Sequence, residues 1–301
     1  MITSSIFYRT LKSHRIDDRF EAIRSSFPHC SILNNYNTHS CDLAIIQGWM
    51  KSGSSTPHNE LRRRVIERQF KHKKHVLTVD GNIFNYLSKN VYFRYSIDGV
   101  FANTGYYFDD MIDPGRWNNI SKNTGCILKP WRKTGDHVLI LMQKNSGWTM
   151  KGEHNLSWCL NTINKIKEYT DRRIVVRLHP TDSHLMDEYV QKLERDNITV
   201  SKNKHILEDL KNAWCSITYN SSPGAVSVIE GIPVFIMDLD HKRSPAYDVG
   251  NTRLDMLEDP SMIDRTQWIQ KISMSHYNIQ DIKDGILWNE VLRYFKKLGK
   301  I

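Results

Sequence analysis

The strongest chemical signal in this sequence is a run of small residues followed by a glutamate, Ser221–Val234 (SSPGAVSVIEGIPV). Small residues let a backbone approach a ligand closely, and free N–H groups at a following helix start can bind phosphate. A glutamate about two helical turns later can accept hydrogen bonds from a ribose diol. The alternative is a plain helix–turn–strand connection with a solvated glutamate. As a nucleotide site, the segment would use Asn220, Ser221, Ser222, Gly224 and Glu230.

Two further polar segments stand where strands are expected to end. Arg177 and His179 belong to the sequence RLHP, and either side chain could bind a diphosphate through charge-assisted hydrogen bonds. A histidine in such a turn can also simply bond the backbone. The loop QKNSG combines polar side chains with a glycine, which suits phosphate or sugar contacts. We expect all of its residues to contact the same ligand: Gln143, Lys144, Asn145, Ser146 and Gly147.

Several familiar nucleotide motifs do not occur in the sequence. It has no G-x-G-x-x-G, no G-x-x-x-x-G-K-[ST] and no aspartate pair for a metal-held diphosphate, which disfavours a dinucleotide enzyme and a P-loop NTPase. The sequence predicts no metal site and no cofactor. Side chains and helix N-termini would then have to neutralise the charge on a leaving group.

The second half of the chain alternates apolar strands with amphipathic helices. Strands are expected over residues 137–142, 174–178, 198–200, 214–219 and 232–237, with helices over 153–169, 183–196, 206–213 and 225–230 between them. Such alternation predicts a parallel sheet covered on both faces. Ligands of such sheets bind beyond the carboxyl ends of the strands, where all three polar segments fall.

The first half is less regular. Strands are expected over 41–47, 75–79 and 96–101, and a helix over 58–71. We predict an α/β fold of two Rossmann-like domains with a cleft between them. Residues 1–133 would form an acceptor-side domain and 134–280 a nucleotide-sugar-binding domain, and a last helix in 281–301 could return to the first domain.

Bulk composition removes other classes of protein. The 301 residues are 40% hydrophobic and 25% charged, and no apolar run is long enough to span a membrane. The first residues lack the apolar block of a signal peptide, so a cytoplasmic protein is expected. The five cysteines form no C-x-x-C pair, which indicates buried free thiols rather than a disulfide framework or a structural zinc site.

The pairing of a strand-ending His-Pro with a later Ser-Ser loop and a glutamate before G-x-P-V resembles the donor half of GT-B glycosyltransferases. It is most similar to the bacterial capsule, Kdo and polysialic-acid transferases, over about residues 137–240. The resemblance implies a metal-independent transferase with a UDP- or CMP-sugar as its donor. It also implies that His179 contacts the donor phosphate, Ser221 and Ser222 the phosphate or base, and Glu230 the ribose. It does not imply an acceptor.

The first half also resembles uncharacterised proteins of tailed phages, through the stretches DGNIFNY and YSIDGVFANTGYY. That likeness implies a hydroxymethylated pyrimidine in phage DNA as acceptor, reached by base flipping in the host cytoplasm. One alternative is the same chemistry on a surface glycan or lipid-linked sugar. Another is a non-catalytic nucleic-acid-binding protein that keeps a Rossmann-like fold.

The charge balance is compatible with a DNA acceptor. Lys and Arg number 42 against 33 Asp and Glu, which leaves a net charge of +9. Rows of cations can follow phosphate backbones and aromatic rings can stack on bases, although a charge run is more often a solvated helix face. The candidate DNA-contacting residues are Arg62, Arg63, Arg64, Arg68, Lys71, Lys73, Lys74, Lys129, Trp131, Arg132 and Lys133.

A transferase also needs a general base for the acceptor hydroxyl, which the first domain normally supplies. Asp80 follows the expected strand 75–79 and precedes a glycine, so it would sit on a strand-end loop. Asp98, also followed by glycine, is the second candidate. Either aspartate could instead serve only to form a turn.

Overall fold

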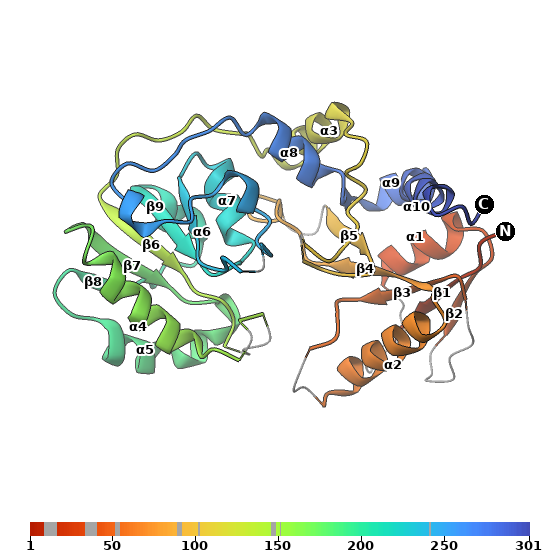
Figure 1. The fold of residues 1–301 in the computed structure, drawn as a ribbon, viewed down its shortest axis with the longest axis horizontal. Coiled ribbons are helices and arrows are strands. Elements are labelled where there is room, and N and C mark those ends of the chain that lie inside the picture. The colour runs from red at the N-terminus through yellow and green to blue at the C-terminus, as the bar shows by residue number, and fades with distance from the viewer. Residues whose placement is uncertain are drawn as a thin grey trace. The chain divides into compact units, whose positions relative to one another are not determined.

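The computed structural model describes residues 1–8, 17–33, 41–51, 55–88, 92–101, 103–145, 149–150, 152–240 and 242–301. They form two compact units (Figure 1). Unit 1 combines Met1–Thr124 with Gln270–Ile301, and unit 2 is Gly125–Ile269. The sequence had placed these boundaries after residues 133 and 280. Each unit is an α/β structure built on a mainly parallel sheet, so the predicted fold class is confirmed.

Unit 2 contains a parallel sheet with the order β10-β9-β6-β7-β8. Its strands are buried on both faces, which explains why they are apolar nearly throughout. Every predicted strand of this half is present, with ends shifted by at most a few residues. The strands are β6 His137–Leu141, β7 Arg173–Arg177, β8 Ile198–Val200, β9 Ala213–Thr218 and β10 Val234–Ile236.

Helices cover both faces of this sheet. α4 and α5 lie on one face and α7 on the other (Figure 1). The helix expected over 183–196 is divided into the end of a 3₁₀ turn and a helix, because Leu185 between them has non-helical dihedrals (φ −95°, ψ 3°). The helical elements are α4 Asn155–Ile166, η1 Pro180–Leu185, α5 Met186–Leu193, α6 Ile206–Leu210, α7 Pro223–Ile229, η2 Tyr247–Val249 and η3 Leu254–Met256, with α8 Thr266–Ser273 leading back to unit 1.

Unit 1 contains a sheet with the order β11-β5-β4-β3-β1-β2. β1 to β4 are parallel, and β5 runs antiparallel to β4. The sequence had missed both strands that precede residue 41. The elements are β1 Ser4–Phe7, α1 Asp18–Ser26, β2 Cys30–Leu33, β3 Leu43–Gln47, α2 Pro57–Lys71, β4 His75–Asp80, β5 Phe93–Ile97, α3 Pro114–Thr124, β11 His276–Tyr277, α9 Ile279–Lys283 and α10 Ile286–Lys297.

Alternate residues of the unit 1 strands serve two separate cores. Leu43 and Ile45 of β3 pack with α1, α9 and α10, while Ala44 and Ile46 pack against α2. Figure 1 shows α2 on one face of this sheet and α1, α9 and α10 on the other. The final amphipathic stretch thus belongs to the core of unit 1. It forms two helices rather than one, because Gly285 separates them with a φ of 75°.

The strand expected over 96–101 lies earlier, as β5 Phe93–Ile97. The chain turns sharply at its end, where Asp98 adopts a φ of 61°. A Cβ on Gly99 would come within 2.6 Å of the backbone of Thr104, so only glycine fits this turn. The apolar residues Val100 and Phe101 therefore belong to a loop, although their composition favours a strand.

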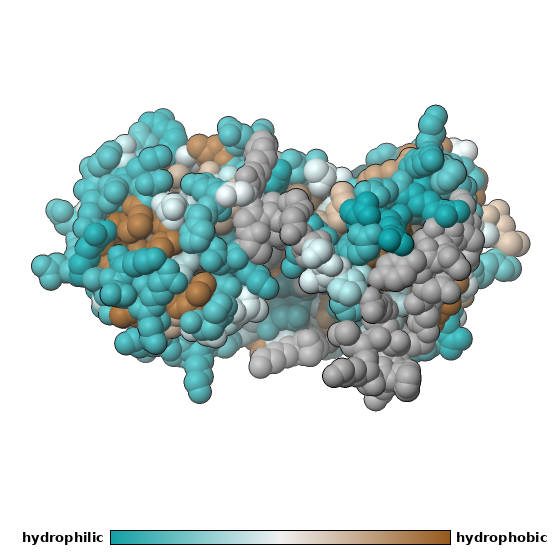
Figure 2. Space-filling view, turned by 90° about the horizontal axis from the view of Figure 1, so that it is seen from below, coloured by the Kyte–Doolittle hydropathy of each residue, from teal (hydrophilic) through white to brown (hydrophobic). Residues whose placement is uncertain are grey.

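All five cysteines are free thiols. Burial raises the pKa of the Cys159 thiol to about 12, so that it remains protonated at neutral pH. Figure 2 shows a face on which hydrophilic residues cover most of the surface and apolar residues form separate patches. Among the described residues, no helix has the length and apolar character needed to cross a membrane.

Residues 125–136 have no regular secondary structure. Backbone hydrogen bonds to the end of α7 and to Gly231 hold this segment in place. Lys129 N donates to Ile229 O at 2.9 Å, and Arg132 N donates to Gly231 O at 2.7 Å. Gly231 has a φ of 78°, and a Cβ there would lie 2.1 Å from Pro130 O. Glycine is therefore required at position 231 for two reasons. Its backbone has a positive φ, and the backbone of Pro130 leaves no room for a Cβ.

We predict that Gly231→Ala destabilises unit 2 by several kcal/mol, because the left-handed conformation costs about 1 kcal/mol and the clash with Pro130 adds to it. Gly125→Ala is the matched control, because Gly125 has a φ of 76° but nothing within 4 Å of an added Cβ. Urea unfolding of both variants measures the difference. Equal losses of stability in the two variants would show that the clash with Pro130 does not affect the free energy of unfolding.

Candidate functional site

A regular pattern marks the carboxyl edge of the unit 2 sheet. The second residue after each of four strands carries a polar side chain: Gln143 after β6, His179 after β7, Asn220 after β9 and Asp238 after β10. β6 is followed by β7 on one side and is flanked by β9 on the other. This reversal of strand order is the place where open α/β sheets bind their ligands. Three of the four residues were predicted from the sequence.

Gln143 and Asn220 join the two loops at this reversal. Gln143 Oε1 accepts a hydrogen bond from Asn220 N at 2.9 Å, and its Nε2 donates to Thr149 Oγ1 at 2.7 Å. Its backbone oxygen accepts from Asn155 Nδ2 at 3.0 Å, and Asn155 Oδ1 accepts from Tyr189 OH at 2.5 Å. These hydrogen bonds tie the loops after β6 and β9 to each other and to α4.

Asp238 is a site residue that the sequence reasoning missed. One carboxylate oxygen accepts from Asn220 Nδ2 at 2.6 Å. The other, Oδ1, is buried and has no hydrogen-bond partner within the described part of the chain. Such an oxygen is costly unless a donor reaches it. The signal that could have identified Asp238 is its place two residues after a strand, which it shares with Gln143, His179 and Asn220.

His179 caps the η1 turn. Its Nδ1 accepts from Thr181 N at 3.2 Å and lies 2.8 Å from Thr181 Oγ1. Because Nδ1 accepts, the proton of the neutral ring is assigned to Nε2. The backbone-bonding role that the sequence left open is therefore present. It also makes Nε2 the nitrogen that can donate to a ligand oxygen at this edge.

The Ser221–Ser222 loop follows β9, and Ser222 begins α7 without a capping hydrogen bond from its side chain. The N–H groups of Gly224 and Ala225 bond to Ser221 O and Ser222 O, at 3.0 and 2.9 Å. The expectation that this helix start offers free N–H groups to a phosphate is therefore wrong for these two amides. The two serine hydroxyls are the groups that remain suited to a ligand.

Gly224 serves packing rather than ligand approach. A Cβ there would lie 2.9 Å from Thr218 Cγ2 and 3.4 Å from Val234 Cγ2. The glycine lets α7 lie close to β9 and β10. This position is buried, whereas Ser221 and Ser222 are partly exposed.

Glu230 lies at the other end of α7 from the serines. It is the C-cap residue, and α7 runs from the carboxyl end of β9 back to the start of β10. Seven helical residues span about 10 Å, so Glu230 is carried away from the edge where ligands bind. Its carboxylate is 7% exposed and forms an ion pair with Lys129. We correct the ribose-binding expectation accordingly.

The side chain of Arg177 is bound by other groups of unit 2. Its guanidinium pairs with the buried carboxylate of Asp209 at 2.5 Å and donates to Asn203 O and Lys204 O, at 3.1 and 3.0 Å. These bonds hold the segment between β8 and α6 against β7. The expected donor contact of Arg177 is therefore replaced by a structural role.

The QKNSG loop is described only in part. Lys144 and Asn145 are exposed, and Asn145 N donates to the buried Asp182 at 2.6 Å. Lys144 is thus a cation beside the carboxyl ends of the strands. The predicted contacts of Ser146 and Gly147 lie outside the described residues.

In unit 1 the two candidate bases lie at opposite edges of the sheet. Asp80 ends β4 at the carboxyl edge of the parallel strands and pairs with Arg94 at 2.8 Å. Asp98 follows β5, which runs the other way, and its carboxylate lies 2.6 Å from Nδ1 of His75 at the start of β4. Asp98 also accepts from Tyr294 OH at 3.2 Å. Strand polarity therefore favours Asp80 and corrects the expectation for Asp98.

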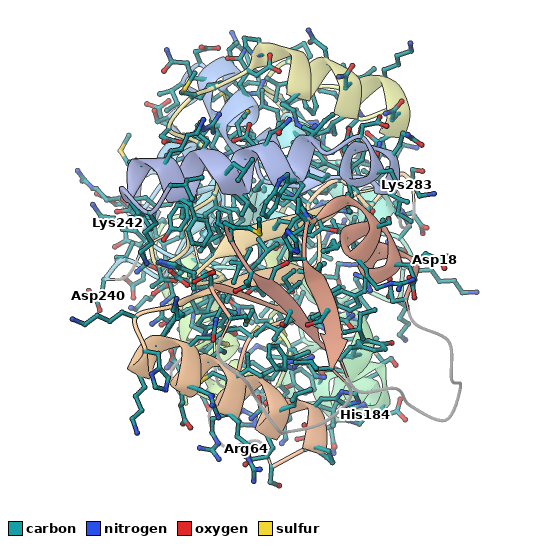
Figure 3. The ribbon with its side chains drawn as sticks, turned by 90° about the vertical axis from the view of Figure 1, so that its right-hand side faces the viewer. Asp18, Arg64, His184, Asp240, Lys242 and Lys283 are labelled. Atoms are coloured by element: carbon teal, nitrogen blue, oxygen red, sulfur yellow. The ribbon has the colours of Figure 1, made fainter. Side chains whose placement is uncertain are left out.

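Several of the basic residues considered for DNA contact are paired within their own unit. Arg63 and Arg64 on α2 form ion pairs with Glu60, and Arg63 also pairs with Glu67. Arg64 projects outward from this helix (Figure 3). Lys74 pairs with Asp42 at 2.5 Å. The solvated helix face is therefore the better description of these side chains.

The cluster around Trp131 is structural. The Arg265 guanidinium lies 3.8 Å from the centre of the Trp131 ring, whose Nε1 donates to Ile263 O at 2.8 Å. Arg132 donates to Leu210 O at 2.6 Å, and Lys129 holds Glu230. The remaining candidates with exposed side chains are Arg68, Lys71, Lys73 and Lys133.

No known family model matches the sequence, and no curated protein matches it. Solved structures do match the fold. The β-Kdo 2,4 transferase of Thermosulfurimonas dismutans KpsC matches with a TM-score of 0.57 at 11% identity, covering 95% of this chain and 98% of the other. The β-Kdo 2,7 transferase of the same protein also gives 0.57, at 12% identity over 96% and 99%. The chain therefore has the GT-B fold, as its motifs predicted. The expected cleft stays a prediction.

We predict that Arg177→Met destabilises the protein by about 3–5 kcal/mol, because it leaves the carboxylate of Asp209 buried without its cation. The side chain of Asp209 is 1% exposed. Arg253→Met is the matched control, because Arg253 is 72% exposed in its pair with Asp255. Such surface pairs contribute little to stability, because water and salt screen them. Chemical denaturation measures both, and similar losses would contradict the structural role of Arg177.

Proposed function

We propose that this protein is a glycosyltransferase that binds a nucleotide sugar at the carboxyl edge of unit 2 and transfers the sugar to a hydroxyl acceptor. The single observation that carries the proposal is the set of Gln143, His179, Asn220 and Asp238 around the β6/β9 reversal. The fold shared with two Kdo transferases supports the same reaction class.

The donor site that we propose has three parts. The Nε2–H of His179 and the hydroxyls of Ser221 and Ser222 donate to the phosphate oxygens. Lys144 adds a positive charge near the leaving group. The buried Oδ1 of Asp238 accepts a hydrogen bond from the nucleoside.

In the reaction, the bond between the anomeric carbon and the donor phosphate oxygen breaks, and the acceptor oxygen forms a new bond to that carbon. The nucleoside diphosphate or monophosphate leaves with the electron pair. We propose that Asp80 takes the proton of the acceptor hydroxyl, since it lies at the carboxyl edge of unit 1. Its ion pair with Arg94 at 2.8 Å holds the carboxylate in place.

For the acceptor, we propose a glycan or a lipid-linked sugar rather than a hydroxymethylated pyrimidine in DNA. DNA binding needs cations that are free to meet phosphates. Arg63, Arg64 and Lys74 are held by carboxylates, which leaves fewer such cations than the sequence suggested.

We predict that one of UDP, CMP, GDP and TDP raises the melting temperature of the protein, since a ligand of the native state adds about 2.7 kcal/mol at a hundredfold excess over its Kd. His179→Asn should abolish the shift, because asparagine can still cap Thr181 but lacks the Nε2–H donor. His184→Ala should keep it, because His184 is an exposed histidine on the same turn. Thermal-shift titration of the three proteins tests this.

Glu230→Gln serves as a second control for the donor site. Because Glu230 lies at the far end of α7, this variant should lose some stability but keep the nucleotide shift. Loss of the shift in Glu230→Gln would restore its expected ribose contact. No shift with any nucleotide in the folded wild-type protein would refute the transferase and favour a non-catalytic binding protein.

We predict no specific affinity for double-stranded DNA beyond weak, non-specific binding. Electrophoretic mobility shifts at roughly 50 mM and roughly 200 mM salt measure this, because affinity from phosphate contacts falls steeply over that range. The double variant Arg63→Gln/Arg64→Gln should behave like the wild-type protein. Tight, salt-sensitive binding that this variant loses would instead support the DNA acceptor.

A further inference from the structure

Unit 1 has its own reversal of strand order. β1 lies between β2 and β3, so the chain builds the sheet first to one side of β1 and then to the other. Sheets of this order bind ligands at the carboxyl ends of those central strands. A small pocket, partly open to solvent, lies there. It is lined by Phe7 of β1 and the following Tyr8, by Ile46 and Gln47 of β3, and by His58, Leu61 and Arg62 of α2.

The Arg62 guanidinium is held over the same edge. Its Cζ and one Nη lie 3.3 Å from the place where a Cβ on Gly48 would stand. Gly48 directly follows β3, has a φ of 69° and donates its N–H to Val79 O at 2.7 Å. A side chain at position 48 would therefore push the guanidinium away. Glycine at this position leaves room for it beside the carboxyl ends of β3 and β4.

Arg62 lacks a counterion in the described part of unit 1. It is half-buried, and no carboxylate among the described residues forms an ion pair with it. Burial lowers its pKa, while the charge of Asp80 raises it. Asp80, however, pairs with Arg94 at 2.8 Å. The edge therefore carries two guanidinium groups and a single carboxylate, which is paired with Arg94, and it keeps an excess positive charge.

The neighbouring arginines of α2 show that this is not a general property of the helix. Arg63 and Arg64 point outward and are neutralised by Glu60. Only the inward-facing arginine, which water reaches less easily, lacks such a partner. A partly desolvated cation without a counterion is unfavourable, and a bound anion would offset that cost.

We infer that the pocket between β1, β3 and α2 binds an oxyanion, a phosphate or a carboxylate, through the Arg62 guanidinium. The planar guanidinium can hold two oxygens of either group at once. The role of the pocket as an acceptor subsite rests on the proposed function, whereas the binding itself does not.

The test is a titration of the ¹⁵N-labelled full chain, followed by NMR at the arginine Nε–H signals. The signal that is missing from Arg62→Gln identifies Arg62. We expect it to shift saturably with inorganic phosphate or with acetate at constant ionic strength, and not with chloride. The anion that saturates at the lower concentration identifies the preferred group. No shift, or the same unsaturated drift with chloride, would overturn the inference.

Two variants separate the site from general effects of charge. Measured by isothermal titration calorimetry, Arg62→Gln should lower the affinity for the preferred anion about tenfold or more, as expected for the loss of charge-assisted hydrogen bonds. Arg68→Gln, an exposed arginine of the same helix, should leave it unchanged. Equal losses in both variants would overturn the inference. Arg62→Gln should not lower the melting temperature, because it breaks no ion pair and removes a partly desolvated cation.

The nucleotide titration distinguishes this inference from the proposed function. Arg62→Gln should keep the nucleotide-induced thermal shift, since the proposed donor site is in unit 2. If the wild-type protein shows anion binding at Arg62 but no nucleotide shift, the transferase proposal fails and the oxyanion site stands. If the nucleotide shift is present and the Arg62 signal does not respond, only the oxyanion site fails.

Discussion

The direction of the strands is the constraint on which the candidate sites depend. In each unit the parallel strands end at one edge, and only residues near that edge can meet a common ligand. Asp80 lies at that edge of unit 1 and Asp98 at the opposite one, although each follows a strand and precedes a glycine. The same constraint separates Ser222 from Glu230, which begin and end a single short helix. Distance along the chain is a poor guide to these separations.

The fold of unit 2 could be predicted because its strands are buried on both faces and therefore uniformly apolar. In unit 1, β1 Ser4–Phe7 contributes two serines and β2 Cys30–Leu33 is only partly buried. Neither has a pattern that stands out from its surroundings. The last strand, β11 His276–Tyr277, is two residues long and pairs with β5 from the far end of the chain. Such pairing depends on tertiary contact, which local composition does not record.

Charges were the least predictable part of the candidate sites. A sequence shows which residues are basic but not which carboxylates they meet. Arg62, Arg63 and Arg64 are adjacent in the chain, yet one faces the sheet and two pair with Glu60 at the surface. Arg177 was assigned to the ligand because it ends a strand, but its partner Asp209 lies in α6. In contrast, the sequence did identify Gln143, His179 and Asn220. Each is the second residue after a strand, and the ends of these strands could be predicted from their apolar composition.

The interleaving of the two units affects the order in which they can fold. Unit 2 is one continuous segment, whereas the core of unit 1 needs Leu287, Val291 and Phe295 of α10 as well as Ile45 of β3. During synthesis, unit 2 can complete its core before α9 and α10 have been made. At that stage these helices do not yet cover the first strands of unit 1. Until then, those strands present an uncovered apolar face to chaperones and to other nascent chains. Unit 2 can therefore fold completely during synthesis before unit 1 does, although the first strands of unit 1 are synthesised earlier.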